Sequence, residues 1–160
     1  MKIKINKKEL SRLLGSHKPR HYIHEKYDYS EVTDMSGLCN GYIHMTEMPY
    51  LDTSNVTNMG HMFTNCKSLK SIPLLDTSNV TNMNGTFRGC KSLKEIPNLD
   101  TSKVKIFNYI FSGCSELKTV PLIDIKHINI KNQQDMFNCC YSLENINPYN
   151  FPCFDFVKLD

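Results

Sequence analysis

The stretch from Leu51 to Pro73, LDTSNVTNMGHMFTNCKSLKSIP, constrains the fold most, because it recurs almost letter for letter. The copies run from Leu75 to Pro97 and from Leu99 to Pro121, so each begins 24 residues after the one before. A fixed period in this range is the signature of a solenoid, in which each unit buries its apolar face only by stacking on a neighbour. The sequence therefore predicts a stack of similar coils around one continuous core.

The same frame extends beyond the three clear copies. One period before the first copy stands Asp28, and the residues after it fit the frame, although Cys39 occupies the place of Phe63. Beyond Asp124 the motif returns with Phe137 two residues late, which predicts a two-residue insertion. We therefore count a degenerate first repeat and a lengthened fifth one.

These observations predict one structural domain with five leucine-rich-like repeats between two caps. The repeats span residues 28–51, 52–75, 76–99, 100–123 and 124–149. Residues 1–27 form a basic N-terminal cap, and residues 150–160 form a C-terminal cap whose phenylalanines can cover the open end of the last coil. With that end covered we expect a monomer, and with it open an end-to-end homodimer.

Each part of a repeat predicts its own local structure. Asp-Thr-Ser is rich in side chains that hydrogen-bond their own backbone, so it predicts a turn at one corner of the coil. The following Val-Thr-x-Met predicts an extended stretch, and Phe63 with its equivalents should begin a short helical turn. Ser68 to Pro73 predicts a strand of a parallel sheet, which the proline ends because it has no N–H to donate.

The combination of V-T-x-M, F-x-x-C-x-S-L-x-x-I-P and D-T-S-N resembles the BspA-type leucine-rich repeats of bacterial surface proteins. The resemblance covers residues 28–149. It implies a right-handed leucine-rich-repeat-like coil, with a parallel sheet on one face and short helical turns, that acts as a protein-binding module and brings no catalytic residues. We expect the chain to differ from the family's surface members, because its sequence shows no pattern of a secretion signal or an anchor and has few repeats. Surface adhesion is therefore one alternative, and an inhibitor by which a phage or mobile element blocks a host protein, such as a defence nuclease, is the other.

The outward positions of the predicted strands form the first candidate binding site. Stacked coils lie about 4.8 Å apart, so residues at one repeat phase make ladders. The partner-binding candidates are Lys67, Lys70, Lys91, Lys94, Glu95, Lys118, Tyr141 and Glu144. Stacked lysines repel one another, which favours a partner protein with an acidic surface. The alternative is that these lysines only keep an adhesive sheet soluble.

The N-terminal cap forms the second candidate site, for a protein or a nucleic acid. Eight lysines and arginines against two glutamates give residues 1–27 a charge of +6 in a chain of net charge +3. The candidates are Lys7, Lys8, Arg12, Lys18, Arg20, His21, Tyr22 and Lys26. We expect an edge strand at 1–5, a helix at 7–14 and a solvated basic loop at 17–27, since Pro19 interrupts a helix there. Basic charge mixed with tyrosines keeps nucleic-acid binding open as the less favoured alternative.

Two residue classes could suggest metals, and neither has a metal-site pattern. The aspartates at 52, 76, 100 and 124 form a ladder, which we interpret as structural because each carboxylate can accept N–H bonds within its turn. Four of the seven cysteines recur at one phase, Cys66, Cys90, Cys114 and Cys140, and predict a buried ladder of free thiols. No C-x-x-C pair occurs, so we predict no metal and no cofactor.

Composition and motifs favour a binding protein over an enzyme or a membrane protein. The 40% hydrophobic and 22% charged fractions are ordinary for a globular chain. No glycine-rich phosphate loop occurs, and Cys39 with His44 is only a weak candidate for a nucleophile and base. Residues 1–14 lack the apolar run of a signal peptide, and no stretch approaches a membrane span. We expect a cytoplasmic location, in the bacterium or an infected host cell, unless the chain is a fragment of a surface protein.

Overall fold

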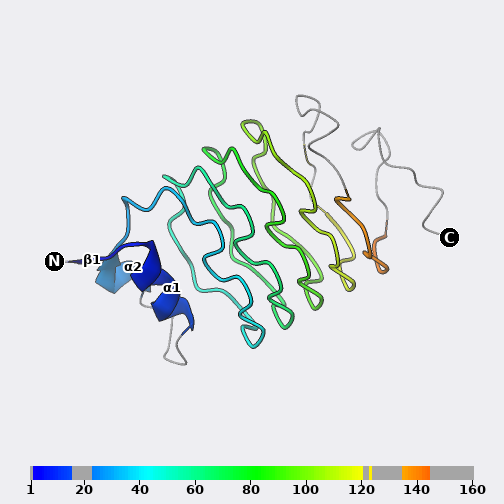
Figure 1. Cartoon of the computed structure of the whole chain (residues 1–160), viewed down its shortest axis with the longest axis horizontal. Helices are drawn as coiled ribbons and strands as arrows, with labels where there is room; N and C mark the ends of the chain where they lie inside the picture. The colour runs from blue at the N-terminus through cyan, green and yellow to red at the C-terminus, as the bar shows by residue number, and fades with distance from the viewer. Residues whose placement is uncertain (1, 16–22, 121–122, 124–134, 145–160) are drawn as a thin grey trace.

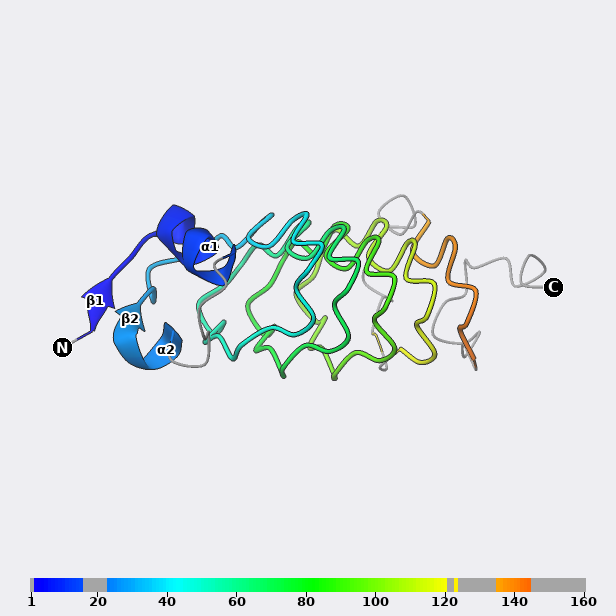
Figure 2. The same cartoon turned by 90° about the horizontal axis from the view of Figure 1, so that it is seen from below.

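The computed structural model describes residues 2–15, 23–120, 123 and 135–144. From Asp28 onward the described chain winds in successive coils that lie side by side along the long axis of the molecule (Figure 1). The view from below shows the same stack with the helices gathered at its N-terminal end (Figure 2). The chain therefore has a repeat fold in which the 24-residue period of the sequence sets the offset between neighbouring coils.

The helices and strands of the described chain lie in the N-terminal cap and end at Asp28, the first residue of the first coil. They are β1 (Ile3–Lys4), α1 (Lys7–Gly15), α2 (Ile23–Lys26) and β2 (Tyr27–Asp28). Neither of these two helices is long and apolar enough to cross a membrane. β1 pairs in parallel with β2, Ile3 opposite Tyr27 and Lys4 opposite Asp28. This offset equals the repeat period, so the cap stacks in frame with the coils, a pairing that the sequence pattern does not reveal.

The helix expected at residues 7–14 is confirmed as α1, and its start has a clear local cause. The Asn6 side-chain oxygen accepts the Glu9 N–H at 3.1 Å, while the Glu9 carboxylate accepts the Asn6 N–H at 3.0 Å. This reciprocal pair is a capping box. On the inner face Leu10 and Leu14 are fully buried, and the Ser11 hydroxyl donates to the Leu38 carbonyl at 2.7 Å. α1 therefore covers the first coil.

Hydrogen bonds between coils follow a strict alternation at the tips of the first three coils, residues 59–66 in the second one. Four N–H groups donate to the next coil, from Met59, His61, Phe63 and Asn65 to the carbonyls of Asn82, Asn84, Thr86 and Arg88, at 2.7–2.9 Å. The N–H groups of Met62, Thr64 and Cys66 donate instead to the carbonyl three residues earlier in their own coil. The tip thus builds a ladder and a turn from the same backbone.

The direction of donation reverses on the two arms that flank the tip. On the arm before it, Thr57 and Thr81 donate to Thr33 and Thr57, each one coil back. On the arm after it, Lys118 donates to Lys94 at 2.9 Å, again one coil back. Tip donors therefore point toward the C-terminal end of the stack and arm donors toward the N-terminal end.

The predicted short helical turns are wrong in detail, because left-handed residues interrupt each tip. Two positions per coil have positive φ, and they are Gly37 and Gly41, His61 and Asn65, Gly85 and Gly89, Tyr109 and Gly113, and Asp135 and Cys139. A right-handed helix cannot continue through such residues. The last pair follows the one before it by 26 residues rather than 24, which confirms the two-residue insertion.

The predicted parallel sheet is also less regular than expected. The strand was predicted on the arm after the tip, where the described residues form one isolated parallel bridge, between Glu47 and Ser71. Three such bridges instead join Asp34, Asn58, Asn82 and Ile106 on the arm before the tip. Each coil turns away after one or two bonds, and Pro73 has no N–H to extend the ladder.

The core is one cluster of buried side chains that runs through all the described coils. Phe63, Phe87, Phe111 and Phe137 stack in a row with ring centroids 5.6–5.9 Å apart. Cys39 precedes this row and is fully buried, which confirms that it fills the place of a phenylalanine in the first coil.

The predicted cysteine ladder is confirmed beside the phenylalanine row. Each thiol donates to a carbonyl one coil back, for example Cys90 to Phe63 at 3.1 Å and Cys114 to Phe87 at 3.0 Å. Burial raises the pKa of Cys66 to about 11 and that of Cys140 to about 12. These thiols therefore stay protonated and act as small apolar side chains with one weak donor.

A first prediction concerns the left-handed positions. We expect Gly85→Ala to destabilise the protein more than Gly37→Ala, two coils earlier at the same phase. Both have positive φ, which costs an added side chain about 1–2 kcal/mol, but a Cβ at Gly85 would lie 2.7 Å from the His61 ring whereas none of the structure lies within 4 Å at Gly37. Urea unfolding measures the difference, and equal losses for the two variants would contradict the packing of His61 on Gly85.

A second prediction concerns thiol reactivity. We expect iodoacetamide at pH 8 to alkylate Cys139 in the native protein while its neighbour Cys140 stays unmodified, because Cys139 is exposed and Cys140 is buried. Cys66, Cys90 and Cys114 should be protected in the same way. Peptide mass spectrometry reads each site, with the urea-unfolded chain as control. Fast labelling of Cys140 in the native state would show that the core is open there.

Candidate functional site

The five lysines predicted on the arm after the tip form one exposed surface, which we call the lysine face: Lys67, Lys70, Lys91, Lys94 and Lys118. Backbone hydrogen bonds fix their register, since the Lys70 N–H donates to the Thr46 carbonyl and the Glu144 N–H to the Lys118 carbonyl, both at 2.8 Å. One column is therefore Thr46, Lys70, Lys94, Lys118 and Glu144. A second column includes Lys67 and Lys91.

None of the five lysines of this face forms an ion pair within the described part of the chain. The two ion pairs found there, Lys4–Glu31 and Lys7–Asp34, lie in the cap and first coil. Two ammonium groups about 5 Å apart in water repel by roughly 1 kcal/mol. Glu95 and Tyr141 are also exposed beside these columns, and Tyr141 is 81% exposed. The face is thus a fixed array of positive charge bordered by groups that can form contacts.

The second candidate site, in the basic cap, is only partly assembled. Lys7 is held by the first coil, with Nζ 3.1 Å from Asp34 and 3.0 Å from the Ser36 hydroxyl. Lys26 lies over the Tyr27 ring at 5.5 Å, whereas Lys8 and Arg12 are exposed on α1. Lys18, Arg20, His21 and Tyr22 fall outside the described residues. The loop expected at 17–27 is wrong for its last part, where α2 and β2 continue the chain into the first coil.

The predicted turn at each Asp-Thr-Ser corner is confirmed. In the second coil Asp52 Oδ1 accepts the Ser54 N–H at 3.1 Å and the Ser54 hydroxyl at 2.7 Å, and Asp76 with Ser78 repeats the pair. Thr53 is buried and donates to the Asp76 carbonyl at 2.9 Å. Among the described residues no three His, Cys, Asp or Glu side chains are grouped as a metal would require. Asp124 lies outside them.

The weak candidates for a catalytic pair do not lie on a common surface. Cys39 is fully buried while His44 is exposed, so substrate cannot reach the thiol from the surface that His44 occupies. His61 is instead fixed between Thr64, at 3.2 Å from Nδ1, and Asn84, at 3.1 Å from Nε2. Thr64 donates its own hydroxyl to the Gly85 carbonyl at 2.8 Å, so its oxygen can accept a hydrogen bond from Nδ1 of His61. This histidine ties two coils together.

Comparison with known proteins places the chain in a family. Residues 9–74 and 68–153 match the model of the family described as "Mycoplasma protein of unknown function, DUF285". The chain belongs to the DUF285 family. A search of curated proteins found no match to it.

Among solved structures, this DUF285 chain is similar to a leucine-rich repeat protein from Bacteroides ovatus. The two are 19% identical, with a TM-score of 0.41. The similarity covers 91% of this chain but 45% of the other, so the DUF285 chain spans less than half the length of that protein.

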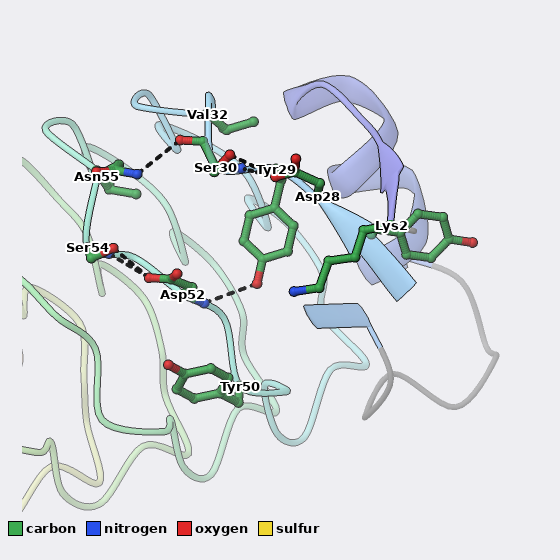
Figure 3. Close-up of a pocket in the computed structure, with 11 residues that line it drawn as sticks. Lys2, Asp28, Tyr29, Ser30, Val32, Tyr50, Asp52, Ser54 and Asn55 are labelled. Atoms are coloured by element: carbon green, nitrogen blue, oxygen red, sulfur yellow. Dashed lines mark hydrogen bonds between the residues drawn. The ribbon is translucent and has the colours of Figure 1, made fainter. Parts of the chain in front are cut away.

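A pocket that was not predicted from the sequence lies where the cap meets the coils (Figure 3). It has a volume of about 200 Å³ and is lined by Lys2 from the cap, Asp28 and Tyr29 from the first coil, and Tyr50 and Asp52 at the passage to the second. The sequence contained a signal for this pocket, because Tyr29 occupies the position in the first repeat that Thr53 occupies in the second. A tyrosine in place of a small residue marks a departure from the repeat.

A third prediction concerns the carboxylates at the Asp-Thr-Ser corners. The Ser78 hydroxyl and N–H hold the pKa of Asp76 below its ordinary value of 3.8. We expect Ser78→Ala to raise the pKa of Asp76, as measured by NMR titration of the carboxyl carbon. A lowered native pKa adds stability that is present above the unfolded value and is lost as pH falls through the native value. When the pH is lowered from 7 to below about 4, the free energy of unfolding should therefore fall less in the Ser78→Ala variant than in the wild type. The control Ser71→Ala, which lies outside any Asp-Thr-Ser corner, should show the same fall as the wild type.

Proposed function

We propose that this DUF285 chain is a non-catalytic protein-interaction module, a right-handed solenoid of five BspA-like leucine-rich repeats whose lysine face binds an acidic protein surface. The observation that carries the proposal is the register of the lysine face, in which five exposed lysines are aligned by backbone bonds and lack ion-pair partners in the described chain. Such an array gains free energy when an anionic surface relieves its repulsion.

The core supports this function by making the array rigid. Phe63 and Phe87 stack almost parallel beneath the coils that carry Lys67, Lys70, Lys91 and Lys94. Backbone positions fixed before binding lose little entropy when a partner docks, which favours affinity. The positive charges attract an acidic partner by electrostatic steering, and the long lysine side chains can then adjust their positions while the backbone stays fixed.

A nucleic-acid partner is less well supported. The described cap residues do not form a free basic patch, since Lys4 and Lys7 are bound to Glu31 and Asp34 of the first coil. Nucleic-acid affinity depends on several lysines or arginines that are free to displace counterions from phosphates. Lys8 and Arg12 on α1 remain available, so they serve to test this alternative.

A fourth prediction tests the lysine face. The wild-type chain should capture a stoichiometric protein from a lysate of its source or host cell, and Lys70→Glu with Lys94→Glu should weaken that complex by at least about tenfold, because like charges at an interface repel. The matched control is Lys103→Glu with Lys105→Glu, which changes the net charge equally on the arm before the tip. It should bind as wild type does.

Circular dichroism of all variants checks that each is folded, and a titration with salt checks the electrostatic origin. Equal loss of binding in both charge-reversed variants would contradict a specific lysine face. Capture of nucleic acid that Lys8→Glu with Arg12→Glu abolishes would assign the function to the cap instead. The identity of a captured protein separates an inhibitor of a host protein from an adhesin.

A further inference from the structure

The pocket at the junction of cap and coils is built by residues that break the repeat. Tyr29 stands where Thr53, Thr77 and Thr101 stand in later coils, and Tyr50 stands at the phase of Leu74 and Asn98. Lys2 comes from the cap, which has no counterpart further along the stack. Repeat proteins keep their core positions fixed and vary the rest, so a pocket formed at such departures is a candidate for specific binding.

Hydrogen-bond donors and acceptors converge on this pocket. Tyr29 is buried, and its hydroxyl oxygen accepts the Asp52 N–H at 3.0 Å, which leaves the hydroxyl hydrogen to donate. Asp52 receives both Ser54 bonds on Oδ1, so Oδ2 retains its capacity as an acceptor. Asn55 donates from Nδ2 to the Ser30 carbonyl at 3.2 Å and keeps Oδ1 as a further acceptor.

Lys2 decides the charge of the ligand. Its ammonium group points into the pocket toward the Tyr29 hydroxyl (Figure 3), and its charge helps to lower the pKa values of Asp28 and Asp52, although the Ser30 and Ser54 bonds are the main cause. An anion in this space would meet two carboxylates, and a cation would meet the ammonium group. The lining therefore favours an uncharged ligand whose groups can both donate to carboxylates and accept from Lys2 and Tyr29.

Size and shape narrow the choice further. A cavity of about 150 Å³ holds one benzene-sized ring, so the pocket, at about 200 Å³, fits a single substituted six-membered ring. Tyr50 is 54% exposed and lies across the pocket from Tyr29 and Asp52 in Figure 3. A half-exposed aromatic ring offers an apolar surface against which the C–H groups of a ligand can pack.

We propose that this pocket binds an uncharged six-membered sugar ring, with its hydroxyl groups bonded to Asp52, Asn55, Lys2 and Tyr29 and its C–H groups packed on Tyr50. A sugar hydroxyl donates one hydrogen bond and accepts others, as this mixed lining requires, and bonds to the charged groups are the stronger ones. The site is independent of the lysine face, so either proposal can hold without the other.

The test is a titration of the full chain, labelled with ¹⁵N, with the methyl glycosides of glucose, galactose, mannose and N-acetylglucosamine. We expect at least one to give saturable shifts of the Asp52 and Asn55 amide signals. Tyr50→Ala should weaken that binding by about two- to tenfold, because it removes the half-exposed ring against which the C–H groups of the sugar pack. The free reducing sugar is titrated in parallel. Binding of the methyl glycoside indicates recognition of a glycan end, whose C1 oxygen is also substituted, and binding of the free sugar alone indicates recognition of a soluble monosaccharide.

Leu74→Ala is the matched control, because Leu74 is 67% exposed one period after Tyr50 and does not line the pocket. It should bind the sugar as wild type does. Lys2→Met, a change at an exposed residue, should weaken binding without affecting the fold. The proposal is overturned if no neutral glycoside gives saturable shifts, if Tyr50→Ala binds as tightly as wild type, or if only amino acids or inorganic phosphate shift these signals.

Discussion

The alternation of hydrogen bonds at the coil tips is the constraint on which the rest of this structure depends. In a sharp turn the N–H groups normally donate to carbonyl groups of the same turn, whereas in a stack they donate to carbonyl groups of the neighbouring coil. Residues with positive φ, such as His61 and Asn65, allow both, because they rotate every second N–H toward the next coil. Phe63, which lies between them, is thereby directed into the core, and the phenylalanine row follows from the backbone pattern.

Residue types alone were enough to predict the parts of the fold that depend on burial and on short-range side-chain bonds. The period, the buried Cys66 phase, the Asp52–Ser54 corner and the insertion before Phe137 all follow from apolar spacing or from side chains that bond their own backbone. The tip was harder to predict, because Gly85 and Gly89 at the left-handed positions of one coil are replaced by His61 and Asn65 in another. Glycine, and less strongly asparagine and aspartate, indicate positive φ in a sequence, whereas residues such as His61 and Tyr109 do not.

The candidate sites were predictable to different degrees for a similar physical reason. A ladder such as Lys70, Lys94 and Lys118 is visible in the sequence because the period sets its register. The state of Lys7 was not visible, since its contact with Asp34 depends on how α1 lies on the first coil. The Tyr29 pocket likewise requires Lys2, whose position is set by the pairing of β1 with β2.

The fixed core and the variable surface are nearly independent in this architecture. The buried Cys90 thiol and the stacked Phe87 ring contact neighbouring coils, while Arg88 between them is exposed. Each coil therefore contributes its own exposed residues without altering the contacts that hold the stack together. A family built this way can change partners by exchanging surface residues coil by coil.

The reversal of donor direction between tip and arms gives the stack a polarity. At any cut between coils, the face toward the C-terminus presents N–H groups at the tip and carbonyl groups on the arms, and the opposite face presents the complementary arrangement. A stray β-strand, whose donors and acceptors alternate uniformly, matches neither face along its whole length. A further element can therefore pair along the whole face of the stack only if it is a coil of the same kind in the same orientation.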